Sequence, residues 1–216
     1  MSRESDTVKG RPTAFPSGRT WLRWAMGWVP LLLIAGLIIA GAVVDGAILR
    51  SRSTSLAPLP ASSIARTPDF RISVYQGEDV LGGEEVKLSE LLAQGKPVVL
   101  NMWAGLCPPC RVEMPDLQEV SEEYGDRVLL FGLDVGPFVG LGSREDGRAL
   151  LEELKVTYPN GTTLDGEVVA RYRVIGMPTT YFIKPNGEVV RQATGLMTKE
   201  KMTELVEELL AKSGGS

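Results

Sequence analysis

Histidine is absent from this chain of 216 residues, and cysteine occurs only twice. Structural zinc takes four ligands, and copper and haem sites usually recruit imidazole, so the absence of histidine disfavours a metal site. The covalent haem motif is missing as well, because Arg111 and not histidine follows the second cysteine, Cys110. We therefore expect no metal and no cofactor.

The two cysteines form the motif Cys107-Pro108-Pro109-Cys110, shortly after the apolar run 98–103. A structural cross-link is one interpretation, but a bridge across so short a loop removes little entropy from the unfolded chain. At a strand-to-helix corner the first thiol lies near the positive end of a helix, which favours its thiolate. That thiolate attacks disulfides, and the second cysteine attacks the mixed disulfide and releases the substrate. The pattern predicts thiol-disulfide exchange in which Cys107 attacks and Cys110 resolves.

Charged side chains are absent from residues 24–44. As a helix this segment spans about 31 Å, the thickness of one hydrocarbon core, and predicts a single transmembrane signal-anchor helix. Five Lys and Arg residues precede it, and three Arg residues follow it as far as residue 66. This bias predicts a cytoplasmic N-terminal segment, residues 1–23, and places the rest of the chain on the extracytoplasmic side of a bacterial cell membrane.

A cleaved signal peptide is the alternative, because Ala40-Gly41-Ala42 is a small-residue triplet of the processing type. Signal peptides have apolar stretches of about 7 to 15 residues, so the longer run here favours an uncleaved anchor. In either case the remainder reaches a compartment where disulfides persist and thiols have to be kept reduced.

Residues 45–66, rich in Ser, Pro and Ala in their second half, are interpreted as a linker. Residues 67–216 are long enough for one domain with a substantial core. They contain 15 Lys and Arg against 24 Asp and Glu, a formal charge of −9, which argues against nucleic acid as a partner. The Gly-containing loop 136–142 lacks the Lys of a phosphate-binding loop.

The domain's hydrophobic pattern alternates between predicted strands and helices. We expect buried strands over 98–103 and 128–135 and a β-hairpin over 179–183 and 188–193. We also expect five helices: one capped by Ser89, one that starts near Cys107, one capped by Ser143, one over 167–172 and one that starts at Thr198. In the helix that starts near Cys107, the expected buried stripe contains Val112, Leu117 and Val120. This order predicts an α/β domain of thioredoxin-like fold, a mixed central sheet with helices on both faces.

Four motifs resemble those of the TlpA/ResA-like membrane-anchored thioredoxins, which include cytochrome c maturation reductases. They are Thr67-Pro68-Asp69-Phe70, Leu100-Asn101-Met102-Trp103-Ala104 leading to the dithiol, Gly176-Met177-Pro178-Thr179-Thr180, and Thr194-Gly195-Leu196-Met197-Thr198. The resemblance covers about residues 67–212 and implies a thiol-disulfide oxidoreductase. It also implies protein thiol and disulfide substrates, such as apocytochrome c, and electrons supplied by a membrane thiol carrier.

The resemblance further assigns roles to individual residues. Pro178 is expected to be a cis proline facing the dithiol, with an ordinary trans turn proline as the alternative. Glu113 matches a glutamate placed three residues after the second cysteine, where it neighbours Cys110 on the helix and could exchange a proton with it; a solvated carboxylate is the alternative. Asn101 stands where ordinary thioredoxins carry a buried acid. The expected substrate-binding set is Trp103, which also walls the thiols, Leu106, Met177, Pro178 and Thr179.

One departure concerns the position before the first cysteine, where the family usually carries a bulky aromatic residue and this chain has Leu106. Two further features remain open: Arg111 either stabilises the thiolate or is a plain exposed residue, and the loop 138–141 either shapes the substrate groove or packs on the surface. The predicted function is reduction of protein disulfides. A DsbA-like oxidant and a thioredoxin-like metallochaperone or adaptor for copper-site assembly are the alternatives.

Overall fold

The computed structural model describes residues 64–214, and the account below concerns that part of the chain. The predicted N-terminal segment, the predicted membrane helix 24–44 and the linker up to residue 63 lie outside the described residues. Within 64–214, no helix has both the length and the apolar character that crossing a membrane requires.

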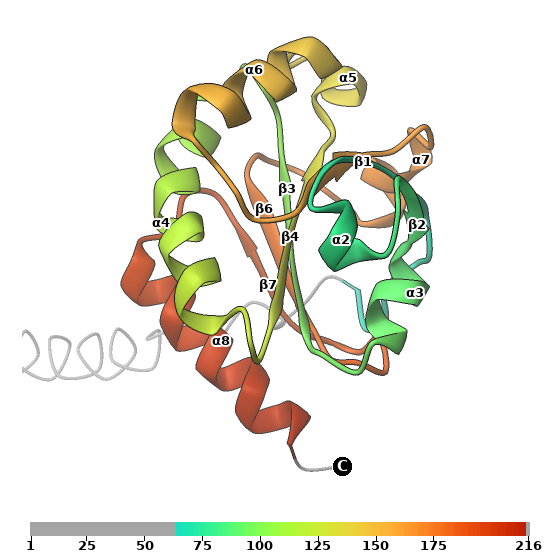
Figure 1. Ribbon diagram of the computed structural model, residues 1–216, viewed down its shortest axis with the longest axis vertical. Helices are drawn as coiled ribbons and strands as arrows, with labels where there is room; N and C mark the ends of the chain where they lie inside the picture. Colours follow the sequence, from blue (N-terminus) through green and yellow to red (C-terminus); the bar gives the residue numbers. More distant parts are fainter. Residues whose placement is uncertain (1–63, 215–216) are drawn as a thin grey trace, which may run out of the picture. The chain divides into compact units, whose positions relative to one another are not determined.

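A seven-stranded mixed sheet forms the centre of the domain (Figure 1). Its order is β2-β1-β5-β4-β3-β6-β7, with β3 parallel to β4, β4 parallel to β5, and the other neighbours antiparallel. The strands are β1 Arg71–Gln76, β2 Glu85–Lys87, β3 Val98–Trp103, β4 Leu129–Asp134, β5 Asn160–Thr162, β6 Thr179–Ile183 and β7 Val189–Thr194. The central strands β3 and β4 are buried along their whole length, as their near-continuous apolar sequences predict.

Helices cover both faces of this sheet, and each face has its own core. The helices are α2 Glu78–Leu81, α3 Leu88–Ala93, α4 Pro108–Tyr124, α5 Gly136–Val139, α6 Arg144–Leu154, α7 Glu167–Arg171 and α8 Lys199–Ser213. Side chains from α4, α6 and α8 pack on one face, and side chains from α2, α3 and α7 pack on the other. Alternate residues of β3 pack on opposite faces of the sheet. Val99 and Trp103 belong to one core, and Leu100 and Met102 belong to the other. The predicted mixed sheet with helices on both faces is confirmed.

Helix starts follow the predicted caps at two places. The Ser143 hydroxyl accepts a hydrogen bond from the Asp146 N–H and completes a capping box at α6, and the Thr198 hydroxyl accepts one from the Lys201 N–H at α8. The third cap was predicted wrongly: Lys87 caps α3, and Ser89 instead binds the Asp69 carboxylate through its N–H and hydroxyl.

Other features differ from the sequence prediction for reasons of packing. Strands β1, β2 and β5 were not predicted, because two of them have only three residues and gain their pairing from tertiary neighbours. A helical turn, α5, occupies the start of the predicted loop 136–142. Val112 was wrongly placed in the buried stripe of α4; it is 61% exposed, and Glu113 and Met114 are buried there instead.

Candidate active site

The dithiol lies at the junction between the end of β3 and the start of α4. Cys107 is the N-cap residue of α4, and its sulfur accepts a hydrogen bond from the backbone N–H of Cys110 at 3.3 Å. Pro108 and Pro109 fill the first two helical positions, where a missing N–H costs little. The two cysteines form a disulfide with their Cα atoms 5.3 Å apart, and they are only 3% and 1% exposed. The helix terminus therefore supplies a backbone donor to the first sulfur.

The loop before β6 runs alongside this corner. The Met177–Pro178 peptide bond is cis, which confirms the cis geometry expected from the resemblance. Thr179 pairs with Met102, so Pro178 lies level with the end of β3 from which the dithiol loop departs. The Gly195 N–H donates to the Pro178 carbonyl at 2.8 Å, and the Thr179 hydroxyl donates to the Gly176 carbonyl at 2.7 Å. Met177 packs against both cores.

Trp103 and Leu106, on the segment that leads to the dithiol, differ in exposure: the first is buried and the second is exposed. Trp103 is fully buried and donates its indole N–H to the Asn160 side-chain oxygen at 3.0 Å, so it supports the loop from inside and offers no surface to a substrate. Leu106 is 60% exposed, and its backbone N–H donates to the Leu141 carbonyl at 2.8 Å. The segment after α5 therefore braces the residue that precedes Cys107.

Glu113 lies one helical turn after Cys110 and is buried, with 1% of its surface exposed. Neither of its carboxyl oxygens has a hydrogen-bond partner. Burial raises the pKa of Glu113 to about 8; the Met197 backbone N–H nearby favours the carboxylate without reaching hydrogen-bond geometry, and the Asp116 charge opposes it. A solvated helical carboxylate does not describe this residue.

Two other residues singled out in the sequence take simple structural roles. Asn101 is buried and donates from its amide to the Thr180 hydroxyl at 2.9 Å, so no acid lies at that position. Arg111 is exposed and pairs with the Glu153 carboxylate across to α6. Its guanidinium is engaged on the surface, away from the buried sulfurs.

Three buried polar residues near the site were not predicted. Asp134, at the end of β4, accepts hydrogen bonds from the Gly136 N–H at 2.9 Å and the Tyr75 hydroxyl at 3.1 Å, and burial raises its pKa to about 6. In the sequence, the position of the Asp134 carboxylate within an apolar strand could have indicated this buried acid. Tyr158 and Asn160 belong to the segment entering β5, and Tyr-Pro-Asn-Gly there resembles an ordinary turn.

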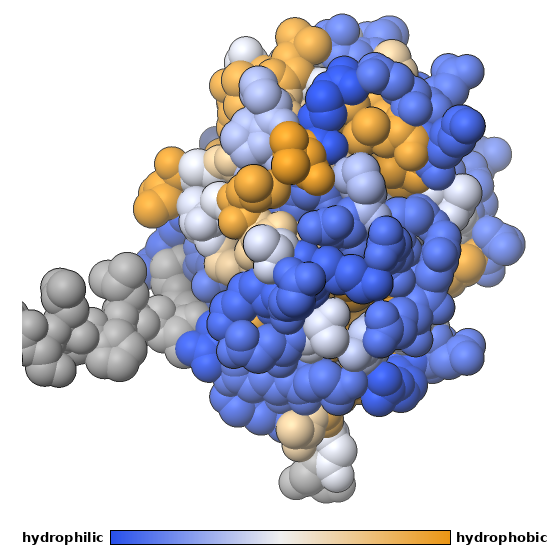
Figure 2. Space-filling model, turned by 90° about the vertical axis from the view of Figure 1, so that its left-hand side faces the viewer, coloured by the Kyte–Doolittle hydropathy of each residue, from blue (hydrophilic) through white to orange (hydrophobic). Residues whose placement is uncertain are grey.

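Apolar side chains are exposed around the dithiol loop and the loops beside it. Leu106, Ile175 and Leu196 are 60%, 88% and 53% exposed, and they come from the dithiol loop, the loop before β6 and the loop after β7. Figure 2, which views the domain from the side of α4 and α6, shows apolar surface gathered towards its upper end and mostly hydrophilic surface below. We call Leu106, Ile175 and Leu196 the apolar rim.

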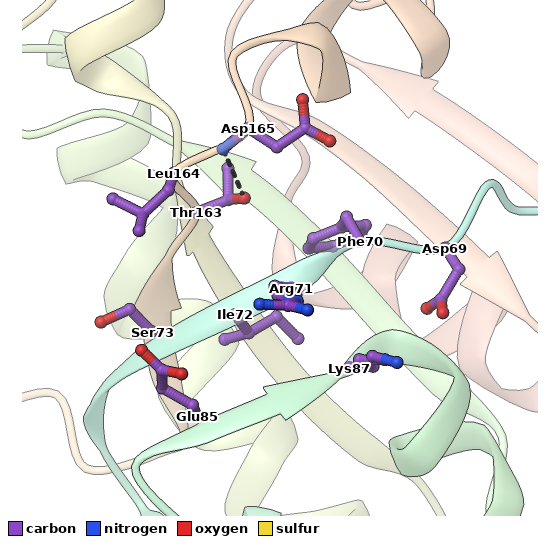
Figure 3. Close-up of a pocket in the computed structure, with 10 residues that line it drawn as sticks. All are labelled: Asp69, Phe70, Arg71, Ile72, Ser73, Glu85, Lys87, Thr163, Leu164 and Asp165. Atoms are coloured by element: carbon purple, nitrogen blue, oxygen red, sulfur yellow. Dashed lines mark hydrogen bonds between the residues drawn. The ribbon is translucent and has the colours of Figure 1, made fainter.

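A cavity of about 410 Å³ lies elsewhere, over β1 and β2 (Figure 3). None of the predicted site residues lines it, and two of its three acidic residues are engaged, Asp69 with Ser89 and Asp165 with Arg171. In the described part of the chain, no three His, Cys, Asp or Glu side chains are grouped as a metal site would need. The two cysteines do not line this cavity either.

A redox-active Cys-Pro-Pro-Cys disulfide at a helix N-terminus, beside a cis-proline loop in a thioredoxin-like fold, defines a thiol-disulfide oxidoreductase. Residues 65–192 match the AhpC/TSA family, and the chain belongs to that family.

Among curated proteins, the chain is 35% identical over 135 residues to the thiol-disulfide oxidoreductase ResA of Oceanobacillus iheyensis, covering 62% of this chain and 66% of that protein. It is 32% identical to the thioredoxin-like protein YneN of Bacillus subtilis, covering 63% of this chain and 74% of YneN. The solved structure of the exposed lipoprotein thioredoxin Etrx1 of Streptococcus pneumoniae is 27% identical, with a TM-score of 0.55 over 65% of this chain and 99% of that one. These relatives place the chain with the ResA-type oxidoreductases.

Proposed function

We propose that this protein is a single-pass, membrane-anchored oxidoreductase that reduces disulfides of protein substrates on the extracytoplasmic side. The dithiol carries the proposal: two sulfurs at the start of α4 with a buried carboxyl of raised pKa one turn further on. The anchor rests on the uncharged segment 24–44. The reductive direction is supported by the similarity to ResA.

The reaction takes two sulfur exchanges. The Cys107 thiolate attacks one sulfur of the substrate disulfide, the substrate S–S bond breaks, and one substrate sulfur leaves as a thiolate that takes a proton from water. The Cys110 thiol then gives its proton to the Glu113 carboxylate, and its sulfur attacks Cys107. This forms the enzyme disulfide and releases the second substrate sulfur, so the substrate gains two electrons and the enzyme dithiol loses them.

Glu113 suits the proton transfer because its pKa lies close to the ordinary value of a free thiol. A free thiol has a pKa of about 8.5, and the pKa of Glu113 is about 8. Transfer between groups of nearly equal pKa has little energetic cost. An exposed glutamate of ordinary pKa would be a far weaker base towards the same thiol.

The substrate is proposed to be an extended protein segment that carries a cysteine pair, with apocytochrome c before haem attachment as the candidate. The apolar rim offers contact area on three loops. Backbone pairing with the substrate is proposed through Met177, because Pro178 has no N–H and its carbonyl already accepts from Gly195. A membrane-embedded thiol carrier would return two electrons to the Cys107–Cys110 disulfide.

Trapping tests this function. Cys110→Ser should accumulate mixed disulfides on Cys107 when the full chain is expressed in its membrane, because resolution is blocked, and mass spectrometry then identifies the trapped proteins. Cys107→Ser is the matched control and should trap none through the remaining thiol. A substrate spectrum without cytochrome c precursors would remove that candidate.

The reduction potential separates the reductase from the alternatives. A value well below about −200 mV fits a reductase, whereas a value near −120 mV would make the protein a DsbA-like oxidant. Tight stoichiometric binding of Cu(I) by the reduced chain would favour the metallochaperone. Partner reduction that continues unchanged in Cys107→Ser would favour the adaptor.

A further inference from the structure

Three buried side-chain oxygens lack a hydrogen-bond partner in residues 64–214, and they belong to only two residues. Two are the carboxyl oxygens of Glu113 and the third is the hydroxyl of Tyr158. Leaving a buried polar atom unpaired destabilises the fold, so native proteins keep such atoms rarely and often for function. Their restriction to one neighbourhood, beside the dithiol, is the observation to explain.

The two residues come from different elements and meet in one core. Glu113 lies on α4, and Tyr158 lies just before β5, packed in the same core as Cys107 and Cys110. Tyr158 is 2% exposed, and the Glu113 charge acts on its hydroxyl. An ionised Glu113 carboxylate accepts hydrogen bonds, and the Tyr158 hydroxyl can donate one. The two unpaired groups therefore complement each other.

The Tyr158 hydroxyl remains a donor throughout the working range of pH. Burial, chiefly, and the Glu113 charge raise the pKa of Tyr158 well above its ordinary value. The neighbouring Asn160 side chain also acts on this hydroxyl and favours its ionised form, so Asn160 serves the hydroxyl as a donor and not as an acceptor. The Asn160 oxygen already accepts from Trp103, and its amide N–H donates to the Tyr158 carbonyl at 2.9 Å. Glu113 is therefore the acceptor available to the hydrogen of the Tyr158 hydroxyl.

The other groups around Glu113 offer no competing donor side chain. Asp116, on the same helix, accepts from the Lys199 backbone N–H, and the Lys199 ammonium pairs with Glu119. From the loop before α8, only the Met197 backbone N–H acts on the carboxyl. No cation of the described residues is paired with Glu113.

We propose that Tyr158 is the positioning residue of Glu113: its hydroxyl donates a hydrogen bond to the carboxylate in the reduced enzyme, directly or through one enclosed water, and so prepares Glu113 to take the proton of Cys110. This inference rests on the role of Glu113 proposed above. Because a hydroxyl donor stabilises the ionised carboxyl more than the protonated one, loss of this bond should weaken Glu113 as a base without disturbing the first sulfur exchange.

The test follows both exchanges of the reduced full chain in mild detergent with the aromatic disulfide DTNB. Attack by Cys107 releases the first thionitrobenzoate, and attack by Cys110 on the mixed disulfide releases the second, so stopped-flow absorbance resolves two phases. In the wild type the second phase should accelerate with pH through a midpoint set by Glu113. Tyr158→Phe should move that midpoint upward by about one pH unit and slow the second phase about tenfold below it, with the first phase unchanged.

Tyr172→Phe is the matched control, because Tyr172 is equally buried but lies in the other core and donates to the Pro68 carbonyl at 2.7 Å. It should lower the unfolding temperature and leave the midpoint in place. Tyr158→Phe should not lower the unfolding temperature, since it removes a hydroxyl that has no partner in the oxidised protein.

The outcomes separate the two proposals. If Glu113→Gln removes the pH dependence of the second phase and Tyr158→Phe leaves the midpoint unchanged, Glu113 is the base and the inference about Tyr158 is wrong. If Glu113→Gln itself leaves the pH dependence intact, the proposed proton transfer fails. A Tyr158→Phe variant that slows both phases and unfolds earlier would reduce Tyr158 to a structural residue and overturn the inference.

Discussion

Replacing Glu113 with Gln should change how the stability of the oxidised protein depends on pH. Burial raises the pKa of Glu113 to about 8, whereas the ordinary value is 4.5. The native state therefore holds the proton more tightly than the unfolded chain does. The stabilising effect is complete below pH 4.5 and is lost as pH rises towards 8, so the free energy of unfolding of the wild type should fall across that window.

The structure sets the size of this effect. At about 1.4 kcal/mol per pH unit, the whole window corresponds to at most about 5 kcal/mol. The core relaxes and admits water around an ionised carboxylate, so we expect about 3 kcal/mol. The Gln side chain has nearly the same shape and no charge, and Glu113→Gln should lack this fall.

Urea unfolding of the oxidised full chain in mild detergent at pH 5, 7 and 9 measures the difference. The two proteins should be similar in stability at pH 5, and Glu113→Gln should be the more stable by about 3 kcal/mol at pH 9. Glu123→Gln, at an exposed carboxylate of the same helix, is the matched control and should retain the fall seen in the wild type. Parallel curves for wild type and Glu113→Gln would refute the claim that Glu113 is a buried acid with a raised pKa.

Two further predictions concern residues that support the site. Burial raises the pKa of Asp134 from 3.8 to about 6, so Asp134→Asn should abolish a fall of about 1–3 kcal/mol in the free energy of unfolding between pH 4 and 6, measured by urea unfolding. A Cβ at Gly132 would lie 1.9 Å from the Asn160 side-chain oxygen and 2.8 Å from the Trp103 indole nitrogen. Gly132→Ala should therefore destabilise the protein by about 2–3 kcal/mol in thermal unfolding, and an unchanged unfolding temperature would contradict the close packing of that pair.

Local sequence chemistry was enough to predict the dithiol corner. The apolar run 98–103, the two prolines at the helix start and the lone cysteine pair all act within a few residues of one another, and the structure forms β3, α4 and the disulfide there. The caps at Ser143 and Thr198 follow the same rule. By contrast, Val112 was misplaced, because two faces of α4 carry apolar residues and only its tertiary neighbours decide which one is buried.

The class of chemistry follows from the amino-acid sequence alone, because the spacing of two sulfurs at the start of a helix is a local property. The sequence also brought Glu113 to the neighbourhood of Cys110, one helical turn away. The burial of this carboxyl depends on the folded chain, which also brings Tyr158 into the core that contains the cysteines and Asn160 against Trp103. The physical reason is that a pKa and a hydrogen-bond partner depend on what surrounds a group in space, and segments far apart in the sequence supply those surroundings.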